Sequence, residues 1–197
     1  YYRGHSLSLL HSMDLRKPEY AMNMLPGNGW KIKSSLSFEW NKFMDGFAVS
    51  EEYSTFGANF KPNNTARIEL ELDRNFTISR TKKIVGTLKT SIGGLSNPEV
   101  DDFFYFFKGG LPGIKGYTFY EESLTGPYFL VSTSNIRIPI FLEKNYVLNQ
   151  LNIQNFSLGS IFQIGKIMNE SIFSEMFNHE DYKLSVGIEL RLHGFSF

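Results

Sequence analysis

The amino-acid sequence predicts an all-β protein, and within that class an antiparallel transmembrane β-barrel with about eight strands in view. Three segments of about twelve residues alternate apolar and polar side chains, which is the period of a strand. Aromatic residues make up 16% of the chain and gather on the apolar side of that alternation. The longest apolar run, Phe103–Phe107, is far shorter than the ~18 residues of a membrane-spanning helix. A barrel needs no such run, because only alternate residues of its strands face lipid.

The clearest strand is predicted over Trp30–Asn41. Its even positions are mostly apolar, its odd positions are polar or charged, and Trp30 and Trp40 stand at the two ends of the apolar face. Ten steps of about 3.3 Å, tilted by about 40°, cover roughly 25 Å, the height of the apolar band of an outer-membrane barrel. We therefore expect Trp30 and Trp40 to belong to the aromatic girdles at the membrane interfaces.

The same alternation recurs over Arg67–Ile78 and Tyr182–His193. The polar face of Arg67–Ile78 carries the acidic row Glu69, Glu71 and Asp73, and charged second faces of this kind favour a water-filled lumen. Adjacent carboxylates on one strand face could also be a catalytic pair or a Ca²⁺ site, but a solvated wall is the more frequent arrangement. Weaker strands are expected at Arg3–Met13, Tyr53–Lys61, Thr81–Ile92, Tyr128–Phe141 and Asn152–Gly165.

The connections complete the prediction. Pro62-Asn63-Asn64 indicates a tight turn over Lys61–Thr65. With that turn, the long connections Asp14–Gly29, Gly93–Pro127 and Lys166–Asp181 fall in positions that could share one side of a membrane. Met168–Phe177 is the one short helix that the sequence suggests. No linker divides the chain, so residues 1–197 are expected to form a single barrel segment.

Composition excludes several functions. The 20 basic and 20 acidic side chains balance, which argues against a nucleic-acid partner. The chain has no cysteine, and its four histidines show no metal-ligand spacing, so we expect neither a metal site nor a cofactor. No nucleophile motif occurs either, and we expect no enzymatic activity.

The connection 93–127, called the glycine loop below, is the most distinctive segment. Its centre is Gly109-Gly110-Leu111-Pro112-Gly113-Ile114-Lys115-Gly116-Tyr117. The glycine spacing matches neither the dinucleotide fingerprint nor the phosphate-binding loop. An ordinary long loop with glycines at positive φ is the plain alternative.

Together with Ser132–Ile140 (STSNIRIPI), the glycine loop resembles the inward-folded loop of the bacterial surface antigen superfamily. This superfamily contains the BAM-type outer-membrane assembly factors and the two-partner secretion transporters. The resemblance implies that the loop folds into the barrel lumen. Lys115 stands at the position of the family's arginine, and Gly116 and Tyr117 complete that motif. The Phe-rich start of the loop is most similar to a subgroup with a Tol-type β-propeller upstream.

The strand residues that match the family's motifs are partly altered. Arg137 and Pro139 match, whereas Asn135 stands where the family has glutamate and Gln163 where it has aspartate. We therefore expect the Lys115 ammonium to face the amide oxygens of Asn135 and Gln163. Further partners of the loop on the lumen wall are expected to be Arg137, Glu69 and Glu189.

The resemblance implies strands seven to fourteen of a sixteen-stranded barrel in the bacterial outer membrane. Its function would concern protein insertion or translocation. Its partners would be outer-membrane lipid, unfolded or substrate polypeptide, and periplasmic or lipoprotein components. A passive porin-like or structural barrel, with the loop as a constriction, is the first alternative. A soluble secreted β-sandwich that binds a ligand is the second, because sandwich strands also alternate.

Overall fold

The computed structural model describes residues 2–17, 25–50, 55–142, 144, 146–148, 151–170 and 172–196. Its long strands are β1 (Tyr2–Asp14), β2 (Gly29–Ser50), β3 (Thr55–Ser79), β4 (Ile84–Leu95), β7 (Tyr128–Phe141), β9 (Leu151–Met168) and β10 (Lys183–Ser196). The short elements are η1 (Asp102–Phe104), β5 (Phe106–Phe107), η2 (Glu122–Leu124), β6 (Thr125–Gly126), β8 (Tyr146–Leu148) and α1 (Ile172–Glu175). The prediction of an all-β, antiparallel protein is confirmed.

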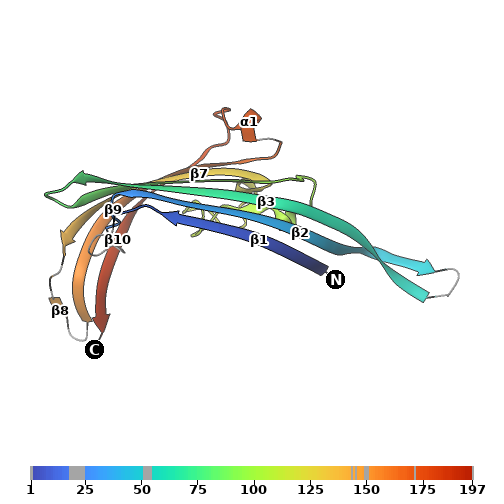
Figure 1. Cartoon of the computed structure of the whole chain (residues 1–197), viewed down its shortest axis with the longest axis horizontal. Coiled ribbons are helices and arrows are strands. Elements are labelled where there is room, and N and C mark those ends of the chain that lie inside the picture. The colour runs from blue at the N-terminus through green and yellow to red at the C-terminus, as the bar shows by residue number, and fades with distance from the viewer. Residues whose placement is uncertain are drawn as a thin grey trace.

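One large sheet has the order β1-β2-β3-β4-β7-β9-β10, and every neighbouring pair is antiparallel. The short β8 pairs with β9 beyond the end of β7, so it continues β7 after a break. Within the described residues β1 and β10 are not paired with each other, so the sheet is open. Figure 1 shows that the sheet is strongly curved, with β9 and β10 bending away from β1, β2 and β3.

The expected turn at Lys61–Thr65 is wrong. This segment lies inside β3 and pairs with Glu39–Phe43 of β2. Continuous cross-strand pairing outweighs the local turn preference of Pro62-Asn63-Asn64. The missing N–H of proline is tolerated there, because β4 pairs with β3 only from Arg67 onward and leaves that side of Pro62 without a neighbouring strand.

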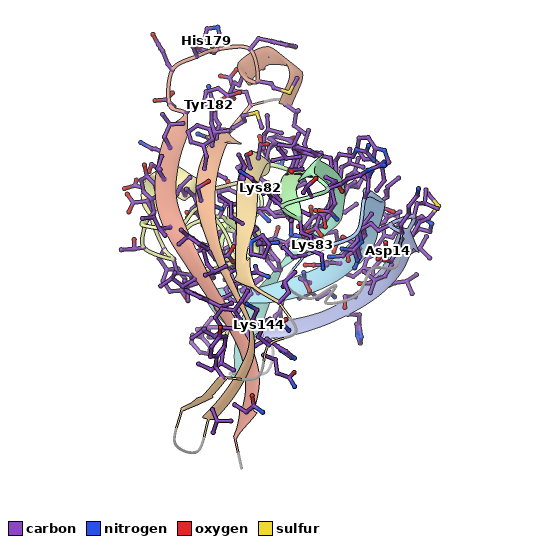
Figure 2. The ribbon with its side chains drawn as sticks, turned by 90° about the vertical axis from the view of Figure 1, so that its left-hand side faces the viewer. Asp14, Lys82, Lys83, Lys144, His179 and Tyr182 are labelled. Atoms are coloured by element: carbon purple, nitrogen blue, oxygen red, sulfur yellow. The ribbon has the colours of Figure 1, made fainter. Side chains whose placement is uncertain are left out.

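The β2–β3 hairpin is longer than its neighbours. β1 reaches only Phe43, so residues 44–50 and their partners in β3 extend past it as a two-stranded ribbon (Figure 1). Two predicted strands thus merge into β3. The chain therefore reverses direction one time fewer than expected, and the connection Asp14–Gly29 lies at the opposite end of the sheet from the connections after β4 and β9. The expectation that all three connections share one side is corrected. Lys82 marks the end where β1 and β3 finish, and Tyr182 marks the start of β10 at the other end (Figure 2).

The apolar face of the sheet is exposed. In β10, Val186, Ile188 and Leu190 are 78%, 80% and 66% exposed. Other large exposed side chains on this face include Trp30, Phe38, Trp40, Ile68, Phe76, Leu88, Ile136, Ile138, Leu158 and Phe162. No second large sheet packs on this face within the described residues, so they do not form the β-sandwich considered above.

The opposite, polar face is the one that the glycine loop covers. At one end of this face, Leu95, Phe129, Val131 and Ile167 replace polar residues in the strands. They form a buried cluster with Phe104, Phe106, Ile114 and Leu124 of the loop. The loop, which runs from 96 to 127 between β4 and β7, therefore lies on the concave side of the sheet (Figure 1). No helix within the described residues is long and apolar enough to cross a membrane.

Candidate functional site

The glycine loop is first attached to the sheet by Arg67 of β3. One terminal nitrogen of its guanidinium donates to the backbone oxygens of Phe104 and Tyr105, at 2.8 Å and 3.3 Å. The guanidinium carbon also lies 4.3 Å from the centre of the Phe106 ring. Arg67 thus fixes the start of the loop by hydrogen bonds and by a cation–π contact.

Lys108 makes the second attachment. Its ammonium lies 3.6 Å from the centre of the Phe129 ring and 3.4 Å from Glu69 Oε2. Burial of the ammonium lowers the pKa of Lys108 below its usual value, and the Glu69 carboxylate opposes that shift. Glu69 was expected to face the loop, and its partner there is Lys108.

The glycines allow the loop to turn back on itself. Gly110 and Gly116 have φ values of 72° and 90°, which disfavour other residues. Gly109 and Gly113 are needed for space, since a Cβ would lie 1.9 Å from Thr118 O at Gly109 and 2.0 Å from Lys108 O at Gly113. The turn is closed by a 2.7 Å hydrogen bond from Ile114 N to Lys108 O.

The tip of the loop, Gly113–Tyr117, is held by Gln163 of β9. Gln163 Oε1 accepts from the backbone nitrogen of Lys115 at 2.9 Å, and Gln163 Nε2 donates to Gly113 O at 3.1 Å. The same Nε2 lies 3.1 Å from Thr133 Oγ1 of β7. Gln163 is 4% exposed, so these bonds are shielded from water. The loop tip is therefore attached through its main chain.

Two further contacts fix the tip. Ile114 is fully buried, and Gly165 leaves room for it, because a Cβ at position 165 would lie 2.5 Å from Ile114 Cδ1. The hydroxyl of Tyr117 donates to Leu184 O of β10 at 3.1 Å. The tip thus spans three neighbouring strands, β7, β9 and β10.

The Lys115 side chain does not make the expected contacts. It is exposed, and in the described part of the chain its ammonium forms no hydrogen bond or ion pair, either with Gln163 or with Asn135. The expectation of an ammonium facing two amide oxygens is corrected, because Gln163 meets the Lys115 backbone instead. The positive charge of Lys115 is left facing open space.

Asn135, Arg137 and Glu189 form a separate network on the polar face. Glu189 Oε2 accepts from Asn135 Nδ2 at 2.9 Å and from Arg137 Nε at 3.0 Å. The other oxygen of Glu189 lies 2.6 Å from the guanidinium of Arg191. The structure therefore brings these residues together with one another, but not with the loop tip.

Trp30 and Trp40 lie near opposite ends of one stretch of β2 and are 46% and 49% exposed. The Arg74 guanidinium lies 5.0 Å from the centre of the Trp30 ring. Phe38 stacks on Trp40 with ring centres 6.4 Å apart. Both tryptophans thus lie on the exposed apolar face, where Trp30 contacts a cationic side chain and Trp40 an aromatic one.

Sequence analysis did not identify Arg67 or Lys108 as site residues, and it gave Thr133 only as an alternative to Ser132 for the first position of the strand motif that the resemblance implies. Lys108 directly precedes the glycine run and stands among phenylalanines, which was a usable signal. Arg67 carries no such local signal. Among the described residues, no group of three or more histidine, aspartate or glutamate side chains could hold a metal ion.

Comparisons with protein-family models, with curated proteins and with solved structures found no match for this chain.

Replacing Gln163 with leucine is expected to loosen the loop tip. The substitution removes both hydrogen bonds to the loop and leaves Lys115 N and Gly113 O without those partners. Loop docking should weaken by about 2–4 kcal/mol, the usual range for two lost bonds with buried partners. Faster hydrogen exchange at the Lys115 amide would measure this.

Lys115→Ala is the matched control, because it keeps the backbone bonds and removes only an exposed side chain. Its effect on docking should stay within about 0.5 kcal/mol. If Lys115→Ala accelerated exchange as much as Gln163→Leu, the attachment would depend on the ammonium after all.

Proposed function

We propose that this chain is part of an outer-membrane β-barrel related to the pores that insert or translocate polypeptides. The glycine loop would then lie inside the lumen. The observation that carries the proposal is the inverted arrangement of the sheet. Its apolar face is exposed, whereas its polar face is covered by the chain's own loop. A water-soluble sheet would bury the first and expose the second.

The apolar face suits a lipid environment. Lipid-facing barrel strands carry an apolar band bordered by aromatic girdles, and Trp30 and Trp40 would belong to these girdles. Charged residues of the same strands point to the other face. One example is Glu71, which bonds to Lys33 at 2.5 Å and to Lys89 at 2.7 Å. This charged wall fits a water-filled lumen.

The glycine loop favours a relative of the assembly and secretion pores over a passive porin. It fills part of the concave side with a buried apolar cluster, and its tip is held by Gln163, at the position where the resembled family has aspartate. A loop held at so many points would obstruct a lumen. In a passive porin, the loop would only narrow the lumen and leave it open to solutes.

The strand count refines the position in a sixteen-stranded barrel. Because β3 replaces two predicted strands, the described residues contain seven long strands, which would correspond to strands eight to fourteen. The remaining nine would complete the wall. An exposed strand edge in such a wall can template an incoming strand of unfolded polypeptide, which is the mechanism proposed for insertion.

Alkaline extraction of bacterial membranes tests the proposal on the native polypeptide that contains this segment. The protein should stay in the membrane pellet, fractionate with the outer membrane and dissolve only in detergent. Its electrophoretic mobility should change on heating, as a folded barrel unfolds. Release into the alkaline supernatant would contradict a membrane location. In planar bilayers, small unstable openings are expected, and steady conductance would favour the porin alternative instead.

A further inference from the structure

The polar face contains a cavity of about 750 Å³ between the loop tip and strands β1 to β4. This volume lies within the range of small-molecule sites, roughly 300–1,000 Å³. The cavity shares Glu69, Lys108 and Gln163 with the contacts that hold the loop, and from there it extends across β1 to β4. Its charged lining consists of Lys33, Lys89, Lys108, Lys115 and Arg191 against Glu69 and Glu71. Arg191 is paired with Glu189, Lys108 with Glu69, and Lys33 and Lys89 share Glu71, whereas Lys115 has no such partner among the described residues.

The two carboxylates of the lining are both ion-paired. Glu71 lies between Lys33 and Lys89, and its side chain is 23% exposed, whereas the two lysines are 46% and 44% exposed. Glu69 is paired with Lys108. At Glu71 a ligand that enters the cavity therefore meets ammonium groups more readily than the carboxylate, whereas at Glu69 the carboxylate is the more exposed partner, 37% against 20% for Lys108. Glu71 is shared by its two lysines, and Asp73 on the same face of β3 adds a negative charge at longer range.

Lys115 supplies a cation without a partner. Its backbone is fixed by Gln163, so the base of the side chain is held in place while the ammonium stays unpaired among the described residues. Thr133 adds a neutral donor to the lining. Its oxygen can accept the proton of Gln163 Nε2, and its own hydroxyl hydrogen then remains available for a ligand.

We infer that this cavity binds a soluble polyanion, a molecule with two or more phosphate or carboxylate groups. The cations come from different walls: Lys33 and Lys89 from β2 and β4, and Lys115 from the loop. A ligand with several anionic groups can bridge them, and a monovalent anion cannot. A cationic ligand would find no unpaired carboxylate, since Glu69 and Glu71 are both ion-paired. This inference goes beyond the proposed function and does not require a membrane location.

Calorimetric titration of the native polypeptide in detergent micelles tests the inference, with inorganic pyrophosphate and citrate as probes. Saturable binding of either probe is expected, with chloride a poor competitor and with affinity falling as salt is added. Lys115→Gln should weaken binding about threefold to tenfold, the value of one charge-assisted contact in a half-open site. That variant keeps the backbone bond to Gln163, so the fold should be unaffected.

Lys82→Gln is the matched control. Lys82 lies in the exposed turn between β3 and β4, does not line the cavity, and loses the same charge (Figure 2). Its affinity should equal that of the wild type. Absence of saturable binding at low salt would overturn the inference, as would equal weakening by Lys115→Gln and Lys82→Gln. Binding by a protein that is released at alkaline pH would overturn the membrane proposal alone.

Discussion

Gly113→Ala is expected to release the tip of the glycine loop from the sheet. A Cβ at position 113 would lie 2.0 Å from the backbone oxygen of Lys108 and 2.4 Å from its carbonyl carbon. No side-chain rotation relieves that overlap, because both atoms belong to the main chain. Lys108 O also accepts from Ile114 N, so moving it away breaks the bond that closes the turn.

The loss should extend to the core contacts of the tip. Ile114 is fully buried in the cluster between loop and sheet. Displacing a buried aliphatic side chain costs about 2–5 kcal/mol, and the hydrogen bonds with Gln163 would be lost with it. Cleavage by trypsin after Lys115 measures the opening of the tip. The rate should rise by at least one order of magnitude, since about 1.4 kcal/mol corresponds to tenfold.

Gly187→Ala is the control for this substitution. Gly187 lies in β10, and a Cβ there would meet no atom within 4 Å. Trypsin cleavage after Lys115 should be unchanged in this variant. Equal cleavage of the wild type and of Gly113→Ala would show that the tip is not held as described.

The second large effect is expected from a charge on the apolar face. Ile188→Arg replaces a side chain that is 80% exposed, so in a water-soluble protein it would change stability by only about 0.5 kcal/mol. In a bilayer the same arginine would cost about 2–4 kcal/mol near the midplane. We therefore expect less folded, heat-modifiable protein in the outer membrane and more aggregate.

Gly187→Arg is the control for Ile188→Arg, because it places an arginine at nearly the same depth in the bilayer. Positions 187 and 188 are adjacent in β10 and point to opposite faces, and the polar face has open space at 187. This arginine should leave insertion unchanged. If both variants inserted as well as the wild type, the apolar face would not contact lipid.

Local patterns predicted most of the strands, because alternation is visible within each segment. The faces of the side chains in Trp30–Asn41 and of Glu69 and Glu71 followed from it directly. The continuity of β3 did not follow, because Pro62 and its neighbours carry a turn signal. That signal is overcome only by pairing with β2, more than ten residues away in the sequence.

The candidate site was predictable in part. The resemblance pointed to Gln163, and this residue does meet the loop tip. The resemblance could not indicate that the contact uses the main chain of Lys115, because a motif specifies side chains. Arg67 contacts the loop across 37 residues of sequence, and only the packing of the loop onto β3 brings them together.

The pairing of the sheet also limits how it can be completed. Six successive antiparallel steps separate β1 from β10, and each step reverses the chain direction, so the two edge strands run the same way. If β1 and β10 paired directly with each other, the seam between them would be parallel. The seams would also be parallel if β1 paired with β10 of a second copy in the same orientation, and β10 with its β1. A ring that is antiparallel throughout needs an odd number of added strands. The nine strands that a sixteen-stranded barrel would add meet this parity condition.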